Sequence, residues 1–303
     1  MNVYLGNMAE ILDGKTLASQ LREDLQAAID ELSDQGVRPG LATVHMGTDA
    51  AAETYIEMKQ RDCDELGMNG VHVDVSPDAP AEELYDAVAD LNSDPDVHGV
   101  LIQDDVPDHI DWLRAIRKID PVKDVDGLHP ENTGRLVAGD PRYIPCTPIG
   151  IQKLLESEGI VIEGADVVIV NRSIIVGKPL SNLLIQKNDG GNATVTICHS
   201  RTRNLGEKTR NSDILIVAAG RPKFIDGSMV SEGTTVVDVG INRVDANNEK
   251  GYELVGDVDF DNVESKADYI TPVPGGVGPM TRVMLHYNTV KAAQIQTGIN
   301  AGL

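Results

Sequence analysis

The stretch ADVVIVNRSIIVGKPL, residues 165–180, decides the fold of this chain. It starts with β-branched apolar residues, passes through a short polar loop and reaches a glycine and a proline where a helix would begin. A buried strand that leads through a loop into a helix is typical of the first unit of a Rossmann-like sheet. Free N–H groups at such a helix start, together with the helix dipole, favour an anion such as a pyrophosphate. We therefore expect Asn171 to lie at a nucleotide phosphate and Gly177 to allow close approach of the backbone.

The same pattern continues on both sides of this stretch. Further strands are predicted at residues 193–198, 213–218 and 235–239, and a closing helix at 280–296. In the first half, segments with the helical spacing of apolar residues also alternate with segments typical of strands. Its predicted helices cover residues 13–32, 51–66, 81–91 and 112–116, and its strands cover residues 41–46, 71–75 and 97–103. Such alternation predicts an α/β protein with parallel sheets covered by helices on both faces.

A loop-rich stretch, residues 120–148, separates the two halves, and 303 residues fit two modest domains. We place the domain boundary at its end. The first domain then starts at residue 1 and ends at 149, and residues 150–280 form the Rossmann-like domain.

Charge and cysteine content exclude several classes of function. The net charge is -22, from 48 acidic and 26 basic residues, which argues against partners such as nucleic acids and anionic membrane surfaces. The acidic residues are spread along the chain, so we hypothesise a solvated, halophile-like surface that screening by salt makes tolerable. No apolar run of about 18 residues and no signal segment is visible. The three cysteines form no ligand pair, so we expect no metal and a reducing, cytoplasmic location.

Basic and hydroxyl side chains follow the first two strands of the second half. Arg172 and Ser173 come directly after the first strand, and His199, Ser200 and Arg201 follow the second. That second strand end normally carries an acidic residue for the ribose hydroxyls, whereas a guanidinium and a hydroxyl suit a 2′-phosphate. The sequence therefore favours NADP over NAD. The alternative is that both arginines are ordinary surface charges.

Four residues of the first half are candidates for chemistry. Tyr55 and Lys59, at i and i+4, share one helix face and could transfer protons or orient water. Gln103 ends a predicted strand, where ligand crevices open, and Asp126 could pair with the amidine-like edge of a pterin. Each also has a plain structural interpretation: an aromatic ring packed on a lysine stem, a polar strand end, and a turn in an Asp-Gly dipeptide.

The loop at residues 271–281, TPVPGGVGPMT, is rich in both proline and glycine. This composition specifies a defined loop shape and not a flexible linker. It directly precedes the last helix and could press its backbone against a flat ring. We count Pro274, Gly275 and Gly276 as substrate-binding candidates.

Together these segments resemble the bifunctional methylenetetrahydrofolate dehydrogenase/cyclohydrolase (FolD) family over nearly the whole chain. The markers occur in the family's order, from ILDGK (11–15) through Tyr55-xxx-Lys59, HGVLIQ (98–103), KDVDG (123–127), PCTP (145–148), Arg172-Ser173 with Gly177, CHS (198–200) and DVGIN (238–242) to the loop 271–281.

The resemblance implies a folate site between two domains and a role for each marker. Tyr55 would stack on the substrate, Lys59 would be the key cyclohydrolase residue, Gln103 would tune it, and Asp126 would hold the pterin. NADP would bind at the positions matching Arg172, Ser173 and Ser200, and we add Ile241 from the DVGIN marker to the cofactor residues. The last helix would return, so that residues 281–303 join 1–149 in the catalytic domain, and a homodimer is usual.

The expected function is oxidation of 5,10-methylenetetrahydrofolate with NADP, followed by hydrolysis to 10-formyltetrahydrofolate, within one-carbon metabolism and purine biosynthesis. Two rivals remain: a dehydrogenase for another one-carbon pterin carrier such as a methanopterin, and a non-catalytic nucleotide-sensing module. The chain departs from the family's usual pattern at Asn171, at Ala52 and at Asp104-Asp105, where the family has Gly, Ser and Leu-Pro. The two carboxylates after Gln103 could weaken binding of folates with long glutamate tails.

Overall fold

The structure, a computed structural model, describes residues 8–48, 50–248 and 251–302, and within this part the side chains of residues 50–53 and 55 are left out of the description. Contacts between Cα atoms divide the chain into two compact units. The six-stranded unit comprises the described part of Met1–Ser19 together with Thr147–Thr281, and the three-stranded unit comprises Gln20–Cys146 and Arg282–Leu303.

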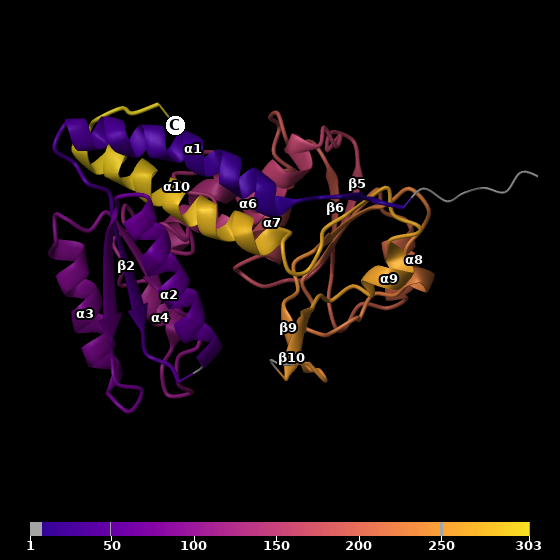
Figure 1. Ribbon diagram of the computed structural model, residues 1–303, viewed down its shortest axis with the longest axis horizontal. Coiled ribbons are helices and arrows are strands. Elements are labelled where there is room, and N and C mark those ends of the chain that lie inside the picture. Colours follow the sequence, from indigo (N-terminus) through magenta and orange to yellow (C-terminus); the bar gives the residue numbers. More distant parts are fainter. Residues whose placement is uncertain (1–7, 49, 249–250, 303) are drawn as a thin grey trace, which may run out of the picture. The chain divides into compact units, whose positions relative to one another are not determined.

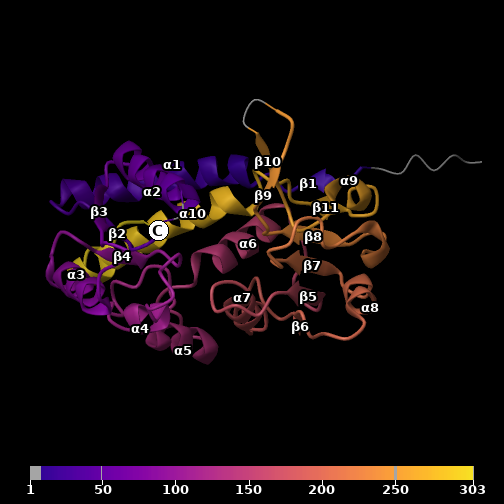
Figure 2. The same ribbon diagram turned by 90° about the horizontal axis from the view of Figure 1, so that it is seen from below.

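The six-stranded unit is built on one parallel sheet. Figure 2 shows its strands from top to bottom in the order β1 (Glu10–Ile11), β11 (Tyr269–Ile270), β8 (Thr235–Asp238), β7 (Ile214–Val217), β5 (Asp166–Val170) and β6 (Thr194–Cys198). The strands β7 and β8 are buried along their whole length, as the apolar runs of the sequence require. Because all six strands are parallel, their carboxyl ends share one edge.

Helices cover both faces of this sheet (Figures 1 and 2). On one side lie α6 (Cys146–Ser157) and α7 (Gly177–Leu184), and on the other lie α8 (Leu205–Arg210) and α9 (Phe260–Val263). A short 3₁₀ turn, η1 (Gly227–Met229), packs beside α8, and an antiparallel hairpin, β9 (Asn242–Asp245) with β10 (Tyr252–Val255), projects after β8. The arrangement confirms the predicted Rossmann-like sheet.

The three-stranded unit has a parallel sheet in the order β3 (Asn69–Asp74), β2 (Gly40–His45) and β4 (Gly99–Ile102). Figure 1 shows α2 (Ala50–Glu65) and α3 (Ala81–Ser93) on opposite sides of β2. The unit also contains α4 (Trp112–Ile116), α5 (Pro130–Ala138) and most of the two long helices α1 (Gly14–Asp34) and α10 (Val277–Thr297). Residues 282–297 of α10 pack in this unit, so the predicted return of the last helix is confirmed.

The helix α5 lies in the stretch interpreted as loop-rich, so that interpretation was wrong for residues 130–138. Its signals were present in the sequence. His129 caps the start through Nδ1, Pro130 occupies the first turn, and Gly139 closes the helix with φ +80°.

The division by contacts differs from the sequence boundary at the N-terminus. The pairing of β1 with β11 places residues 8–19 in the six-stranded unit, although a start at residue 1 was expected for the other domain. The strand β1 is only two residues long, too short for a periodic signal. Among the described helices, none has the length and apolar character needed to cross a bilayer.

Candidate active site

Lys59 and Gln103 meet in the three-stranded unit. Lys59 extends from α2, Gln103 follows the last residue of β4, and Nζ of Lys59 donates a hydrogen bond of 3.0 Å to Oε1 of Gln103. The glutamine that the resemblance assigns to tuning Lys59 is therefore in direct contact with its amine. The backbone of Tyr55 lies one turn earlier in α2, and its side chain lies outside the described residues, so its orientation stays a prediction.

Lys59 and Asp126 influence each other's charge. Burial lowers the pKa of Lys59, and the negative charge of Asp126 is the strongest opposing effect. Burial and the neighbouring Asp124 raise the pKa of Asp126 to about 6, although the Lys59 charge and a hydrogen bond from the Cys146 thiol act the other way. A lysine pushed toward its neutral form beside a carboxyl that titrates near neutrality is an arrangement suited to proton transfer.

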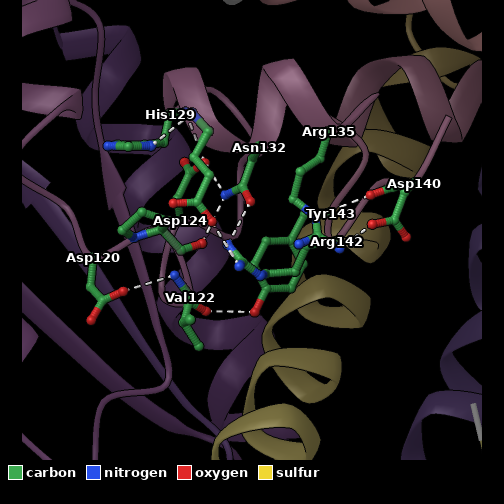
Figure 3. Close-up of polar contacts among 11 residues, drawn as sticks. Asp120, Val122, Asp124, His129, Asn132, Arg135, Asp140, Arg142 and Tyr143 are labelled. Atoms are coloured by element: carbon green, nitrogen blue, oxygen red, sulfur yellow. Dashed lines mark hydrogen bonds and ion pairs between the residues drawn. The ribbon is translucent and has the colours of Figure 1, made fainter. Parts of the chain in front are cut away.

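The loop that carries Asp126 is fixed by the buried carboxylate of Asp124 (Figure 3). Its Oδ2 accepts hydrogen bonds from the backbone N–H of His129 at 2.8 Å and from Nδ2 of Asn132 at 2.7 Å. Asn132 is held in turn by Arg142, whose Nη1 donates to Oδ1 at 3.0 Å. The interpretation of Asp126 as a turn residue therefore does not explain the loop fully, because the hydrogen bonds of Asp124 and Asn132 also hold the loop in position.

The last helix contributes a residue that the sequence did not suggest. Asn288 of α10 is buried, and its Nδ2 donates to the backbone oxygens of Val125 at 2.8 Å and Ile144 at 3.0 Å. It therefore ties the residue before Asp126 to the segment before Cys146. The available signal in the sequence was an asparagine one turn away from the apolar residues Met284, Leu285 and Ala292 of the same helix.

The nucleotide candidates gather at the carboxyl edge of the six-stranded sheet. The chain order reverses at β5, with β6 on one side and β7 on the other, and ligands bind at such switch points. Asn171 joins the two loops there, since its Nδ2 donates to the backbone oxygen of Ala218 at 2.6 Å. Its Oδ1 accepts from the N–H groups of Ser173 and Gly177 at 2.7 and 2.9 Å.

The expectation of free N–H groups at the start of α7 is wrong for its first residues. The N–H of Gly177 is bonded to Asn171, that of Lys178 to the oxygen of Ser173, and that of Val176 to Oγ of Ser173. Gly177 is needed because an added Cβ would lie 2.3 Å from the backbone oxygen of Asn171. The loop therefore gains its shape from internal bonds, and Arg172 remains exposed at its surface.

The turn after β6 presents the other basic group. Nδ1 of His199 accepts a hydrogen bond of 3.1 Å from the N–H of Arg201, and the N–H of His199 donates to Oγ1 of Thr202 at 2.8 Å. These bonds order the turn and leave Ser200 and Arg201 exposed. No carboxylate occupies residues 199–203, which suits a phosphorylated ribose.

The loops after β8 and β11 are coupled. Oγ1 of Thr271 accepts the N–H of Asp238 at 2.7 Å, and the loop after Thr271 packs closely on the start of α1. An added Cβ on Gly14 would lie 1.9 Å from the oxygen of Gly276, and the oxygen of Gly275 accepts the N–H of Lys15 at 2.9 Å. Gly275 has φ +119°, which explains the glycine. The ILDGK and PVPGG segments of the sequence therefore form one structural unit.

On the same edge, Ile241 is 45% exposed and Pro274 is also exposed. Both are thus accessible to a ligand at the carboxyl ends of the strands.

Sequence reasoning also missed the loop after β7. The carboxylate of Asp257 accepts hydrogen bonds from three consecutive N–H groups, those of Ala219, Gly220 and Arg221, at 2.6 to 2.9 Å. This loop borders the switch point. The sequence signal for this loop was the pair Ala219-Gly220, which directly follows the strand predicted at residues 213–218. Among the described residues, no cluster of His, Cys, Asp or Glu could hold a metal ion.

A phosphate-type loop after β5, with a basic turn after the neighbouring parallel strand β6, defines an α/β protein that binds a dinucleotide. The other unit adds a half-buried lysine, a glutamine and a carboxyl suited to acid–base chemistry. Family models match both parts: the tetrahydrofolate dehydrogenase/cyclohydrolase catalytic domain over residues 12–126, and the NAD(P)-binding domain of the same family over residues 145–297. The chain belongs to the tetrahydrofolate dehydrogenase/cyclohydrolase family.

Known relatives resemble the chain over nearly its full length. It is 63% identical over 296 residues to the "Bifunctional protein FolD" of Natronomonas pharaonis, an alignment that covers 98% of this chain and all of the relative. The FolD crystal structure from Campylobacter jejuni is 42% identical, with a TM-score of 0.89 over 95% of this chain and 99% of the other. The Trypanosoma brucei FolD, solved with NADP cofactor and an inhibitor, is 36% identical, with a TM-score of 0.90 over 97% of this chain and 100% of the other.

Proposed function

We propose that this protein oxidises 5,10-methylenetetrahydrofolate with NADP and then hydrolyses the methenyl product to 10-formyltetrahydrofolate. Membership of the family supports both steps. The observation that carries the proposal is the hydrogen bond between the half-buried Lys59 amine and Gln103, beside a carboxyl with a raised pKa at Asp126.

For the first step, bound NADP supplies the hydride acceptor. The residues at the sheet edge fit that group, because Arg172 and Arg201 are both exposed where the phosphates of a dinucleotide would lie. Ser173 and Ser200 offer hydroxyl groups at the same strand ends. We assign Ile241 and the Pro274–Gly276 loop to the flat rings that the two substrates present.

For the second step, water adds to the cationic methenyl carbon, and the carbon–nitrogen bond to N5 then breaks. Lys59 accepts and returns the proton in this sequence, since burial favours its neutral form. Gln103 holds the amine in place through its carbonyl oxygen. Asp126 pairs with the pterin edge, and Tyr55 stacks on the substrate ring. Residues 1–149 with 281–303 then serve the folate, and residues 150–280 serve NADP.

The test is to supply 5,10-methylenetetrahydrofolate with NADP or with NAD to the purified protein and to follow the reduced cofactor by absorbance. We expect rapid NADPH formation, slower NADH formation and decay of the methenyl product. No reduced cofactor with either nucleotide would contradict the proposal. Turnover of a methylene-methanopterin in place of the folate would then identify the rival carrier, and inactivity with both carriers would favour a sensing module.

We also propose that the protein is a cytoplasmic homodimer. The three cysteines are free and buried, which suits a reducing compartment, and a dimer is usual among proteins that the sequence resembles. Sedimentation at several protein concentrations checks the stoichiometry. A mass of one chain, 32.6 kDa, at all concentrations would reject the dimer.

A further inference from the structure

Asn288 of α10 holds the peptide group that joins Val125 to Asp126. It is 1% exposed, and its Nδ2 donates a hydrogen bond of 2.8 Å to the carbonyl oxygen of Val125. That oxygen belongs to the same planar amide as the backbone N–H of Asp126. A rotation of this amide would break the bond to Asn288 and turn the Asp126 side chain, so the direction of that side chain depends on the bond.

The side-chain amide of Asn288 also reaches a second segment of the chain. Its Nδ2 donates to the carbonyl oxygen of Ile144 at 3.0 Å, and Sγ of Cys146 lies 3.6 Å from the Val125 oxygen. An asparagine Nδ2 carries two protons, which these two carbonyl oxygens use. An aliphatic side chain at this position would leave the buried Val125 oxygen with only a weak thiol donor.

Close packing restricts the loop on both sides of Asp126. An added Cβ on Gly99 of β4 would lie 2.6 Å from Cγ1 of Val125, so the valine side chain fills the space that this glycine leaves. Gly127 has φ +70°, and an added Cβ there would lie 3.1 Å from the backbone nitrogen of Pro145. The loop therefore has little room toward β4 and toward Pro145, and Asn288 fixes it from the side of α10.

We propose that Asn288 is a positioning residue for folate binding, which aims the carboxyl group of Asp126 at the pterin by holding the carbonyl group of Val125. The inference rests on the proposed role of Asp126 in holding the pterin. It gives the return of the last helix a purpose in substrate binding. The helix α10 contributes an amide that fixes the substrate loop, in addition to its buried apolar side chains.

A purely structural role for Asn288 predicts a different result. A residue that only stabilises the fold would change the free energy of unfolding and the yield of folded enzyme. The folded molecules would still bind the folate with normal affinity. The affinity for the folate, separated from the turnover rate and from the affinity for NADP, therefore distinguishes the two roles.

The decisive experiment measures the dehydrogenase kinetics of Asn288→Ala, with methylenetetrahydrofolate and NADP varied in turn. The KM for the folate should rise roughly threefold to tenfold, the size expected from lost hydrogen bonds. The kcat and the KM for NADP should stay close to those of the wild type, because the residues assigned to NADP lie in the other unit. An unchanged KM for the folate, or an equal rise for both substrates, would overturn the inference.

The double variant with Asp126→Asn tests whether the effect passes through Asp126. In the Asp126→Asn background, adding Asn288→Ala should leave the KM for the folate unchanged within about twofold, because the contact that Asn288 supports is already lost. If the two losses multiply in full, Asn288 acts by another route and the inference is wrong.

Thr289→Val is the matched control. Thr289 follows Asn288 in α10 and is also buried, but its Oγ1 donates to the oxygen of Leu285 within the same helix at 2.8 Å. Its KM for the folate should equal that of the wild type, and a rise as large as that of Asn288→Ala would count against the inference. A wild type that forms no NADPH refutes the proposed function. Normal wild-type activity with an unchanged folate KM in Asn288→Ala refutes only the role of Asn288.

A measurement on the wild type covers the case in which Asn288→Ala does not fold. NMR of protein carrying isotope-labelled asparagine follows the two Nδ2 protons of Asn288. Binding of the folate should slow the exchange of these protons with solvent, because contacts that favour binding are in turn favoured by it. Exchange that the folate leaves unchanged, or that NADP alone slows equally, would contradict the inference.

Discussion

At the residue scale, the function depends on two groups whose surroundings move their pKa values toward each other. Burial makes Lys59 easier to deprotonate and Asp126 harder to ionise. Neither effect is visible in a sequence, because it depends on how much protein surrounds each side chain. The hydrogen bond from Lys59 to Gln103, in contrast, was predictable from a helix position and a strand end.

The pKa of about 6 at Asp126 predicts a pH-dependent affinity for the folate. As the pH falls through about 6, Asp126 gains a proton and its attraction for the pterin edge weakens, so the KM for the folate should rise. Asp126→Asn should have a high KM at every pH and should lack this inflection. Steady-state kinetics between pH 5 and 8 would check both proteins, and an inflection that survives in Asp126→Asn must belong to another group.

Arg201 should determine the preference for NADP. A charge-assisted contact with a phosphate contributes about 1.5–3 kcal/mol, so Arg201→Ala should raise the KM for NADP about tenfold or more. The KM for NAD, which lacks the 2′-phosphate, should change little. Arg203→Ala, which changes an exposed arginine two residues further on, is the control. Equal losses for NADP and NAD would assign Arg201 a structural role.

At the element scale, the strands and most helices were predictable from periodicity, because their apolar faces meet a sheet that must be covered. The exceptions are instructive. The helix α5 is short and owes its limits to His129, Pro130 and Gly139. The strand β1 exists only because β11 offers it a partner. The N–H groups of Ser173 and Gly177 donate to the side chain of Asn171, and no sequence pattern indicates these partners.

The junction of α1, α2 and α10 in the three-stranded unit is held by one buried carboxylate, that of Asp62. Nη1 of Arg22 lies 2.8 Å from its Oδ1, and Nη1 of Arg282 lies 3.1 Å from its Oδ2. Removing one partner of such a buried pair is costly, so Asp62→Asn should lower the free energy of unfolding by about 3 kcal/mol. Glu65→Gln, which removes the exposed partner of Arg22, should cost less than about 1 kcal/mol. Urea unfolding measures both variants, and similar losses would mean that the junction does not depend on Asp62.

The same junction predicts loss of stability in acid. Burial alone would raise the pKa of Asp62, but contacts with His286 and Arg22 outweigh it and hold the pKa below the usual value. Stability from Asp62 is therefore present above its unfolded pKa and is lost as the pH falls through its folded pKa. Burial also lowers the pKa of His286, which must gain a charge on unfolding as the pH falls below about 6.5. Melting curves should show that Asp62→Asn narrows the gap between the melting temperatures at pH 7 and pH 3.

At the scale of the whole molecule, the net charge of -22 sets the behaviour in salt. Dispersed acidic residues repel one another, and added salt shortens the range of that repulsion. The melting temperature should therefore rise between low salt and about 2 M NaCl or KCl. Both salts should act alike if screening is the cause. A melting temperature that ignores salt would contradict the halophile-like interpretation of the surface.

The most direct test of the proposed function compares the wild type with Lys59→Met in both reactions. Methylenetetrahydrofolate and NADP are mixed with each protein, and NADPH and the methenyl product are followed together. We predict that both proteins form NADPH, while only the wild type hydrolyses the methenyl product faster than water alone. Hydrolysis by Lys59→Met at the wild-type rate would contradict the assignment of Lys59, and absence of NADPH from the wild type would contradict the function itself.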